Sequence, residues 1–521
     1  MVRVNSIAIR QRCSTASIAA RVRLFGIATC AVFGVFYLVV HLTPLSQDPS
    51  SLHTDWKTPN RHYPFSQKPK DVVLAAVDLP ISAQRNATGF LRFVPTLGGL
   101  ATGLSAYNQR AQHKWIGWAG IVADNLTEPD KRDMDEFSHG FCSSILWPVF
   151  TDGEVTGNAS FNYSADWRAY QTVNTMFLDK ILNVTDAESS VWIHDFQLML
   201  LPAMLRQRRP RSRIGFFFHI PFPAPKRFVT LSWGKEIMEG LLGADLLGFQ
   251  IVDFAKNFLE TVAFYGLGRV NNVTISILNH DRRVRVGHFP IGIDYEKFST
   301  AQEKVGVVRM DDVERLKKMN LGRKIILTVD RLDPAKALLE RVDAFQSLLK
   351  QHSRFRGKVS LFMVVVPHRL EVKRFRNLGI TLQKQIDSVN RDFGDPQWQP
   401  ITLLYQFVPF DKLVTLYQLA DVAFIAPWRD GMNLVAKEYL ASNERGVLVL
   451  SRSAGAARDL TEAVLVDVRQ PASMVNGLLQ ALTMPAEEAR RRAGQMRKYL
   501  QRTDVHAWGD GFVRTLMERG L

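Results

Sequence analysis

From about residue 71 onward, short apolar runs alternate with stretches of helical periodicity, and this alternation narrows the fold more than any other feature. Continuous apolar strands separated by helices are typical of parallel sheets that are buried on both faces. Helix-spaced apolar residues predict helices at 101–107, 167–182, 197–206 and 229–242. The apolar runs predict strands at 72–77, 190–193, 214–219, 246–249, 284–289, 325–329, 359–366, 403–407, 422–426 and 446–450.

Two sets of strands, joined near residues 290–298, predict an α/β protein with two Rossmann-like domains that face each other across a cleft. A chain of 521 residues has room for this arrangement, at roughly 150 residues per domain. Ligands of such sheets bind beyond the carboxyl ends of the strands. We expect an N-terminal segment at 1–45, a linker at 46–70, Rossmann-like domains at 71–292 and 293–485, and a helical segment at 486–521.

The N-terminal segment contains an uncharged, mostly apolar run at 24–42, close to the roughly 20 residues that span a bilayer. Arginines precede the run at positions 3, 10, 12, 21 and 23, and the first acidic residue of the chain is Asp48. The positive-inside rule therefore predicts a single-pass transmembrane helix whose N-terminus is cytoplasmic. A cleaved signal peptide and a buried core helix are the alternatives. The sequence leaves open on which side of the membrane the catalytic domain lies.

The formal net charge of +16 suits three kinds of partner: nucleic acid, an anionic membrane surface or phosphorylated small molecules. The sequence has no zinc-type Cys/His spacing and no RNA-binding signature, so nucleic acid is the weakest of the three. Of the three cysteines, only Cys142 lies beyond the N-terminal segment, which excludes a disulfide framework and a cysteine metal site. We expect phosphorylated small molecules as partners, and a homo-oligomer is left open.

The run 427–441 follows an apolar strand and opens a helix. Gly431 lets the backbone come close to a ligand, and the first free N–H groups of the helix attract phosphate. Asp430 lies before the turn and Glu438 lies two turns into the helix. This arrangement suits a phosphorylated sugar, because the amides can bind the phosphate and the carboxylates can bind the hydroxyl groups. An ordinary strand–turn–helix with a polar cap is the alternative.

Further polar residues stand where other strands end. Gly98 and Gly99 form a second turn of the phosphate-binding type before a helix, although such a pair is weak evidence alone. His194 and Asp195 follow one predicted strand, and His219 ends another. A lone histidine at a strand end is more often structural, but two strand ends that present His and Asp to one cleft indicate a site.

Three cations follow strands of the second set. Arg331 and Lys336 are five residues apart across a strand-to-helix turn, so both can reach a diphosphate at the cleft. They would stabilise the charge that builds on a leaving nucleotide diphosphate. Arg369, after the strand at 359–366, adds a third cation. A solvated Arg/Lys pair is the alternative.

These segments together resemble the trehalose-6-phosphate synthase family, a group of retaining GT-B glucosyltransferases. The resemblance runs from about residue 72 to the C-terminus, in order and without large gaps. The motifs that carry it are Trp115-Ile-Gly-Trp118, Leu146-Trp147-Pro148, Trp192-Ile-His-Asp195, Gly215-Phe-Phe-Phe-His-Ile-Pro-Phe-Pro223, Phe289-Pro-Ile-Gly-Ile-Asp294, Asp330-Arg-Leu-Asp333 and Arg429-Asp-Gly-Met-Asn-Leu-Val-Ala-Lys-Glu-Tyr439.

The resemblance implies a donor site, expected to bind UDP-glucose. Gly99 matches the glycine that lies against the donor phosphates, and Arg331 and Lys336 match the pair that grips the diphosphate. His219 matches the histidine beside the transferred glucose. Asp430, Asn433 and Leu434 match the loop that holds the glucosyl ring and phosphate. Glu438 matches the carboxylate that binds the ribose hydroxyls.

On the acceptor side, Asp195 matches the acidic residue that meets the acceptor sugar. Trp118 and Trp147 match the aromatic residues that line this side, and Arg369 matches a residue that grips the acceptor phosphate. The reaction implied is transfer of glucose to glucose 6-phosphate with retention, without a metal or other cofactor. The residues expected to be catalytic are Asp195, His219, Arg331, Lys336 and Asp430.

The acceptor side also departs from the family pattern. Asp78 stands where family members have an arginine for the acceptor phosphate, Ser138 replaces a tyrosine, and Ala337 replaces a glycine. A carboxylate beside a phosphate dianion is repulsive by about a kcal/mol or more at short range. Three functions therefore stay open: a trehalose-6-phosphate synthase, a related glucosyltransferase with another acceptor, and a catalytically weakened regulator that binds sugar phosphates.

Overall fold

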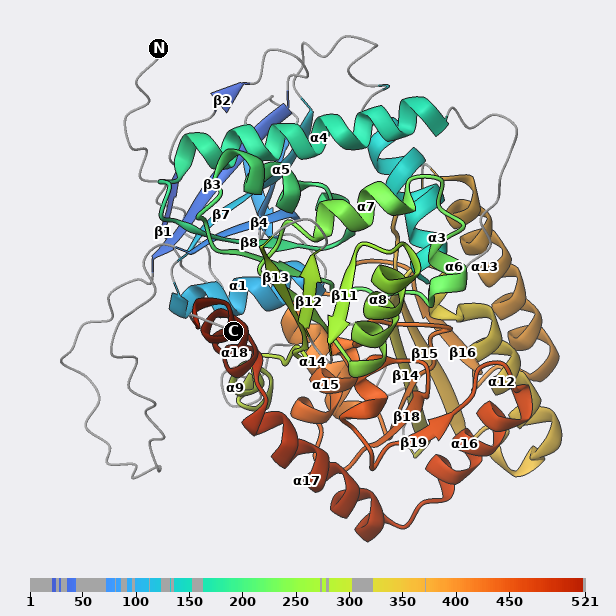
Figure 1. Cartoon of the computed structure of the whole chain (residues 1–521). Coiled ribbons are helices and arrows are strands. Elements are labelled where there is room, and N and C mark those ends of the chain that lie inside the picture. Colours follow the sequence, from blue (N-terminus) through green and yellow to red (C-terminus); the bar gives the residue numbers. More distant parts are fainter. Residues whose placement is uncertain are drawn as a thin grey trace.

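The computed structural model of the chain describes residues 21–24, 28–29, 35–43, 72–79, 81–85, 91–95, 99–111, 113–122, 132, 135–151, 163–271, 274–277, 281–301, 322–370 and 372–518. Two large sheets lie in different halves of the molecule, and helices pack around both (Figure 1). The first sheet is built from residues before position 302, and the second is built from residues after position 321. This arrangement confirms the predicted α/β class.

The first sheet has a parallel centre whose strands β8, β9 and β10 are buried along their whole length, because helices cover both faces. Its parallel strands are, in spatial order, β7 (Lys114–Val122), β4 (Val72–Asp78), β8 (Ser190–His194), β9 (Ile214–Phe217), β10 (Leu246–Phe249) and β13 (Arg283–His288). Its antiparallel edges are β1 (Arg21–Leu24), β2 (Ala28–Thr29) and β3 (Val35–Thr43) on one side, and β12 (Thr274–Ile277) and β11 (Gly268–Asn271) on the other.

Helices and a hairpin complete this half. The hairpin pairs β5 (Ile81–Arg85) with β6 (Leu91–Pro95). The helices are α1 (Gly99–Ala111), the π-helix η1 (Glu136–Leu146), α3 (Trp147–Phe150), α4 (Tyr163–Val184), the 3₁₀ turn η2 (Phe196–Leu198), α5 (Leu201–Arg208), α6 (Pro225–Phe228), α7 (Gly234–Leu241), α8 (Val252–Phe264) and α9 (Tyr295–Ser299).

The described residues of the N-terminal run lie in strands rather than in the predicted helix. Val35–Thr43 is strand β3, which pairs antiparallel with β7 at the edge of the first sheet. Its β-branched and aromatic residues suit a strand as well as a membrane helix. Among the helices of the described ranges, none has the length and apolarity that crossing a bilayer requires. The predicted linker at 46–70 lies outside the described residues.

The second sheet is wholly parallel and is the more regular of the two. Its strands are, in spatial order, β16 (Ile401–Leu404), β15 (Val359–Val366), β14 (Lys324–Arg331), β17 (Val422–Ile425), β18 (Val447–Ser451) and β19 (Val464–Val466). The connecting elements are η3 (Pro334–Lys336), α12 (Leu338–Gln351), η4 (Ser353–Phe355), α13 (Lys373–Phe393), α14 (Phe410–Leu419), α15 (Leu434–Ser442), η5 (Gly455–Arg458) and α16 (Pro471–Thr483).

Some predicted elements are displaced. The expected helix at 197–206 is divided into η2 and α5, and Pro202 stands in the first turn of α5, where a proline starts a helix without losing a hydrogen bond. The expected helix at 229–242 is shorter and is observed as α7, Gly234–Leu241. The strand expected at 403–407 lies at Ile401–Leu404. Its start is held by Asn390, whose side chain bonds both the amide of Ile401 (2.8 Å) and its carbonyl oxygen (2.9 Å).

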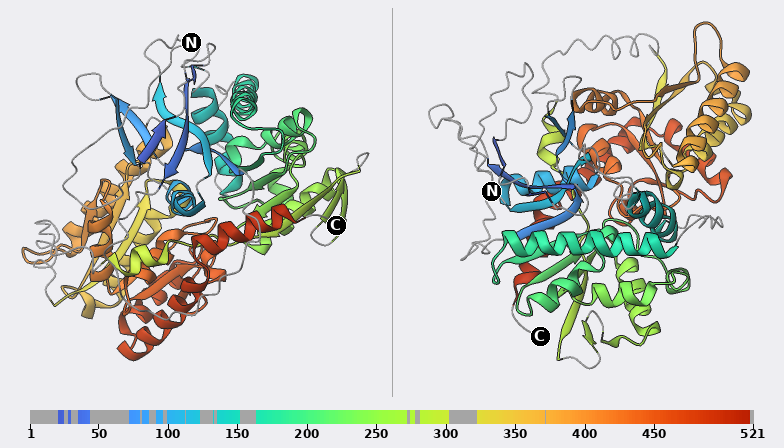
Figure 2. Two further views of the ribbon diagram at one scale, coloured as in Figure 1. Left: turned by 90° about the vertical axis from the view of Figure 1, so that its left-hand side faces the viewer. Right: turned by 90° about the horizontal axis from the view of Figure 1, so that it is seen from above.

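The end of the chain joins the two halves. Helix α17 (Ala486–Arg502) lies on the second half, and α18 (Val505–Met517) returns to the first half beside α1 (Figure 2). There Phe512 stacks on Trp192 of β8, with ring centroids 4.4 Å apart and an angle of 8° between the planes. One hydrophobic core contains residues of both halves, so the two sheets are packed as parts of one structure.

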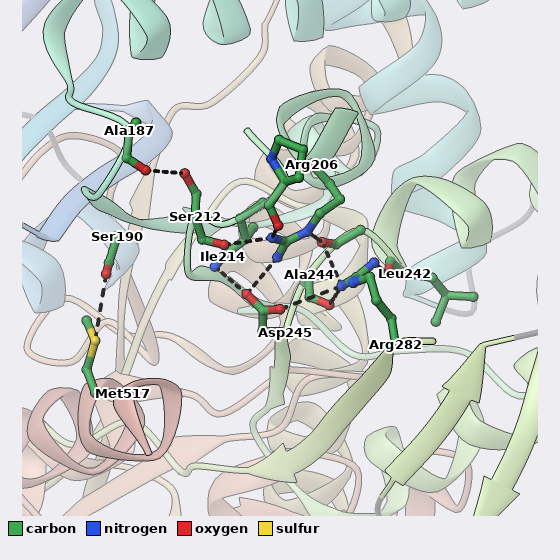
Figure 3. A network of polar contacts seen from close by, with 12 residues as sticks. Ala187, Ser190, Arg206, Ser212, Ile214, Leu242, Ala244, Asp245, Arg282 and Met517 are labelled. Atoms are coloured by element: carbon green, nitrogen blue, oxygen red, sulfur yellow. Dashed lines mark hydrogen bonds and ion pairs between the residues drawn. The ribbon is translucent and has the colours of Figure 1, made fainter. Parts of the chain in front are cut away.

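A charged network closes the amino ends of the first sheet, opposite the edge where ligands of such sheets bind (Figure 3). Asp245, just before β10, accepts from Arg206 (2.7 Å) and from the amide of Ile214 at the start of β9 (2.8 Å). Arg282 lies 3.6 Å from the other oxygen of Asp245. These bonds tie two central strands and α5 together, and their place in the fold is structural.

Candidate active site

The carboxyl ends of the two sheets face each other, and the predicted site residues lie at this junction. A side chain at Gly431 would put its Cβ 2.0 Å from the carbonyl oxygen of His219, so only glycine allows this close approach of the two halves. Arg429 donates to the carbonyl of Phe222 (3.1 Å). The indole N–H of Trp147 donates to Asp333 (3.4 Å). The strand ends of both halves therefore form one site.

The donor side is centred on an ion pair. Lys336 Nζ lies 2.5 Å from Asp430 Oδ2, and Asn433 Nδ2 donates to the same oxygen at 3.0 Å. Burial alone would lower the pKa of Lys336, but Asp430 and Asp330 outweigh burial and raise it, so the lysine stays charged. Asn433 also caps α15, since its Oδ1 accepts from the amide of Ala436 at 3.0 Å. The structure thus brings together a cation, a carboxylate and a helix N-terminus, as predicted.

A second, buried pair supports the turn that carries Lys336. Arg341 of α12 lies 2.6 Å from Asp330 and donates to the carbonyl of Lys336 at 2.6 Å. Both side chains are almost fully buried, so removing one partner would leave an uncompensated charge. This pair was not predicted from the sequence. The sequence indicated it only through Asp330, which directly precedes Arg331, and through an arginine on the following helix.

Backbone strain is concentrated at the site. The non-glycine residues with positive φ in the described ranges are Asp195 (69°), Ala337 (50°), Arg369 (50°) and Asn433 (79°). Each was singled out from the sequence, and each follows a strand of the junction or opens a helix beside it. Residues in such conformations persist where the surrounding structure holds them, and they cluster at functional sites.

The remaining donor residues occupy two helix starts and one helix face. Leu434 is the first residue of α15, and Gly99 is the first residue of α1. Glu438, on α15, accepts a hydrogen bond from the hydroxyl of Tyr417 at 2.8 Å. Burial raises the pKa of Glu438, while this hydrogen bond and Lys297 lower it. The sequence offered no signal for Tyr417.

On the first half, Asp195 and His219 lie at neighbouring strand ends. Asp195 accepts from the backbone amide of His219 at 3.2 Å. Burial raises the pKa of Asp195 to about 7 against the opposing amides of His219 and Phe196, and the nearby Asp78 adds to the rise. Burial lowers the pKa of His219 to about 3, so this imidazole is neutral. His219 also shares a hydrogen bond of 3.1 Å with His194.

The acceptor side combines opposite charges, as the sequence departures indicated. Asp78 is the last residue of β4, is paired with Trp118 of β7 and is exposed. Reduced hydration between the cleft walls raises its pKa, and Arg331 and Arg369 act in the opposite direction. The guanidinium of Arg369 lies 5.6 Å from the ring centre of Trp147, at cation–π distance. Asp78 therefore faces the cations that would receive an anionic acceptor.

Two further observations complete the acceptor side. Nη1 of Arg369 is buried and has no hydrogen-bond partner within the described ranges. Ser138 lies in the π-helix η1, where its carbonyl oxygen accepts from Ser143 at 2.6 Å. Helices of this kind often occur at functional sites.

No cluster of three or more His, Cys, Asp and Glu side chains in the described ranges could hold a metal ion. Arg331, Lys336 and Arg369 contribute positive charge to the junction. Arginine and lysine side chains can stabilise the charge of a transferring or leaving phosphate group.

Comparisons with known proteins identify relatives of this chain. The model of glycosyltransferase family 20 matches residues 70–518. The UDP-forming alpha,alpha-trehalose-phosphate synthase of Candida albicans is 33% identical over 468 residues, which are 85% of this chain and 97% of that protein. The bifunctional trehalose-6-phosphate synthase/phosphatase of Thermoproteus tenax is 36% identical over 451 residues, and the chain spans 60% of its length.

Solved structures show the same similarity at 28% identity. A Burkholderia xenovorans synthase in complex with glucose 6-phosphate superposes with a TM-score of 0.75, over 86% of this chain and 100% of that one. The E. coli enzyme bound with UDP-2-fluoro glucose superposes with a TM-score of 0.76, over 86% and 99%. The chain thus belongs to glycosyltransferase family 20, the family of the trehalose-6-phosphate synthases.

Proposed function

We propose that this protein is a UDP-forming glucosyltransferase that moves glucose from UDP-glucose to glucose 6-phosphate with retention, giving trehalose 6-phosphate. The observation that carries the proposal is the Lys336–Asp430 pair beside Arg331 at the junction of the two sheets. The pair puts a cation and a carboxylate just before α15, within electrostatic reach of Arg331. We infer that a diphosphate and a glucosyl ring bind together there.

The chemistry follows from these charges. The bond between the glucosyl anomeric carbon and the diphosphate oxygen breaks, and the anomeric carbon forms a new bond to the oxygen of the acceptor hydroxyl, whose proton passes to the departing diphosphate. Negative charge grows on the leaving UDP, and Arg331 and Lys336 stabilise it. A diphosphate that binds Lys336 competes with Asp430, whose carboxylate then becomes available to accept from a sugar hydroxyl. Asp195 and His219 meet the sugars from the other half.

A second candidate function, transfer to a less charged acceptor, is favoured by Asp78. Its carboxylate offsets part of the positive charge of Arg331 and Arg369 and repels a phosphate dianion. Asp78→Asn removes the repulsion with little change of shape, and we expect the KM for glucose 6-phosphate to fall roughly tenfold. Because Asp78 also acts on Arg331, we expect a smaller decrease for UDP-glucose. An unchanged KM for glucose 6-phosphate would contradict this role.

The experiment that separates the candidates is an acceptor screen. UDP release from UDP-glucose is measured with glucose 6-phosphate, glucose and other neutral or phosphorylated sugars. We expect glucose 6-phosphate to be used, weakly in the wild type and better by Asp78→Asn. A neutral acceptor that is used far better would favour the second candidate. Donor binding without turnover on any acceptor would favour a regulator.

We also propose that the N-terminal segment attaches the chain to a membrane. The sequence alone supports this, through the apolar run 24–42 and the arginines before it. Alkaline extraction of membranes from cells that express the full chain tests it, because an integral anchor resists extraction. Quantitative release into the soluble fraction, together with lower stability after deletion of residues 1–45, would assign the run to the sheet edge alone.

A further inference from the structure

Two histidines at neighbouring strand ends form a pair with one shared hydrogen bond. His194 is the last residue of β8 and is fully buried, and His219 follows β9, the next strand of the sheet. His194 Nδ1 and His219 Nε2 are 3.1 Å apart. The position of the proton on one ring therefore determines which nitrogen of the other ring can donate.

Aromatic rings hold the pair in place. The ring of His194 lies 4.6 Å from that of Trp192 and 6.4 Å from that of Phe217. The ring of His219 lies 4.8 Å from Phe217 and 5.9 Å from Trp508 of α18. Nε2 of His194 has no hydrogen-bond partner in the described ranges. The polar contact of the His194 ring is thus directed at His219.

Both imidazoles are neutral. Burial, and then the neighbouring His219, lower the pKa of His194 well below its ordinary value, and burial lowers the pKa of His219 to about 3. A neutral imidazole has one N–H and one bare nitrogen, so only two arrangements of the pair are available. Either His194 donates through Nδ1, or His219 donates through Nε2.

The surroundings of His194 favour the second arrangement. The π faces of aromatic rings carry partial negative charge, which stabilises an N–H more than a lone pair. The buried Nε2 of His194 has no hydrogen-bond partner in the described ranges, and the nearby Trp192 ring, 4.6 Å away between centroids, favours a proton there. His194 then accepts through Nδ1. His219 then carries its proton on Nε2 and keeps a bare Nδ1. Because His219 is partly exposed at the junction, this nitrogen can accept from a ligand.

We propose that His194 is a positioning residue that holds His219 in the Nε2–H tautomer and makes its Nδ1 an acceptor for a hydroxyl group of the transferred sugar. The inference deepens the proposed function and rests on it for the identity of the sugar. The tautomer itself is a property of the protein alone.

The first test is nitrogen NMR of protein labelled with ¹⁵N-histidine, without substrate, between pH 7 and 8. The His219 signals are assigned by their loss in His219→Gln. We expect the pattern of the Nε2–H tautomer in the wild type and a shift toward a mixture in His194→Leu. An Nδ1–H tautomer in the wild type would overturn the inference, whether or not the enzyme turns over glucose 6-phosphate.

The second test compares kinetics. His194→Leu removes the acceptor, and we expect kcat to fall roughly tenfold with a smaller effect on KM, as for loss of one orienting hydrogen bond. His194→Asn, whose amide oxygen can accept from His219, should recover most of the loss. His352→Leu, at the end of α12, is the matched control and should behave as wild type. Equal losses in the Leu and Asn variants would mean that His194 only fills space.

Discussion

At the residue scale, the site is built from charges that partner one another across long stretches of sequence. Lys336 and Asp430 are 94 residues apart in the chain, and their side chains are only 14% and 17% exposed. At such positions water hydrates the charged groups poorly, so each charge is stabilised mainly by its partner. Asp195 is also buried, and burial raises its pKa. Ala337 is uncharged, but its backbone has a strained, left-handed conformation.

The Lys336–Asp430 pair predicts a large effect on activity. Lys336→Ala removes a cation from the diphosphate site and leaves Asp430 unpaired, so we expect kcat/KM to fall by about 10²-fold or more. Lys235→Ala is the matched control, because Lys235 pairs with Glu239 at 3.9 Å on the exposed face of α7. Steady-state UDP release measures both. Near-normal turnover of Lys336→Ala would remove the donor-site assignment.

Asp195 predicts a specific dependence of stability on pH. Its folded pKa of about 7 exceeds the ordinary value of 3.8, so the folded state binds more protons between these values. This contribution to the unfolding free energy is complete below about pH 4 and is lost as the pH rises through 7. Asp195→Asn cannot ionise, so we expect it to gain stability relative to the wild type between pH 5 and 8. Urea unfolding at several pH values checks this, and parallel curves would contradict the shifted pKa.

The conformation of Ala337 predicts that alanine-to-glycine substitutions at positions 337 and 335 have opposite effects on stability. Ala337 has φ 50° and ψ 49°, a left-handed conformation that costs alanine roughly 1–2 kcal/mol. Ala337→Gly relieves this strain, and we expect a stability unchanged or raised by up to about 1 kcal/mol. Ala335, in the preceding 3₁₀ turn, has no positive φ, so Ala335→Gly should destabilise by about 1 kcal/mol. Equal losses at both sites would argue against strain at Ala337.

At the scale of elements, the packing of helix α18 depends on its glycine residues. Gly509 faces α1, and a Cβ there would lie 2.3 Å from the ring of Tyr107. Gly511, on the same helix, has no heavy atom within 4 Å of an added Cβ. Tyr107 also donates to Asp510 at 3.4 Å, which fixes the helix against the first half.

The two glycines predict changes of opposite sign. Gly509→Ala forces Tyr107 or the helix to move, and we expect a loss of about 1–3 kcal/mol from overpacking. Gly511→Ala should stabilise by about 0.5–1 kcal/mol, because alanine favours the helix and meets no obstacle. The prediction is checked by measuring the thermal unfolding midpoints of both variants and of the wild type. A stabilising Gly509→Ala would show that α18 is not docked as described.

Much of the fold was predictable from the sequence, because buried parallel strands leave continuous apolar runs. The strands expected at 190–193, 246–249 and 359–366 agree with β8, β10 and β15 to within a residue. Strand β7 was missed, since its two glycines weaken the strand pattern, and β19 is only three residues long. Helix α4 begins at Tyr163, before the predicted start at residue 167.

The candidate site was predicted as a set of residues but not as a network. Residue types at strand ends indicated Arg331, Lys336, Asp430 and His219, because the carboxyl ends of parallel strands converge. The pairings of Asp330 with Arg341, of Tyr417 with Glu438 and of His194 with His219 depend on side-chain directions that no local pattern encodes. The left-handed conformation of Ala337 is likewise set by the surrounding fold.

At the scale of the whole molecule, the two sheets bring residues of both halves to one junction, where we propose that donor and acceptor bind on opposite sides. The returning helix α18 keeps the halves packed around it. The proposed reaction joins the donor and acceptor sugars at their anomeric carbons with retention of the donor configuration.

The most direct test is to identify the product by NMR. The protein is incubated with UDP-glucose labelled with ¹³C at the anomeric carbon and with unlabelled glucose 6-phosphate. The account predicts an α-configured ¹³C anomeric signal coupled through oxygen to the anomeric carbon of the glucose 6-phosphate unit, and release of UDP in equal amount. A β-configured product, transfer to a different hydroxyl, or bound UDP-glucose that never reacts with this acceptor would contradict it.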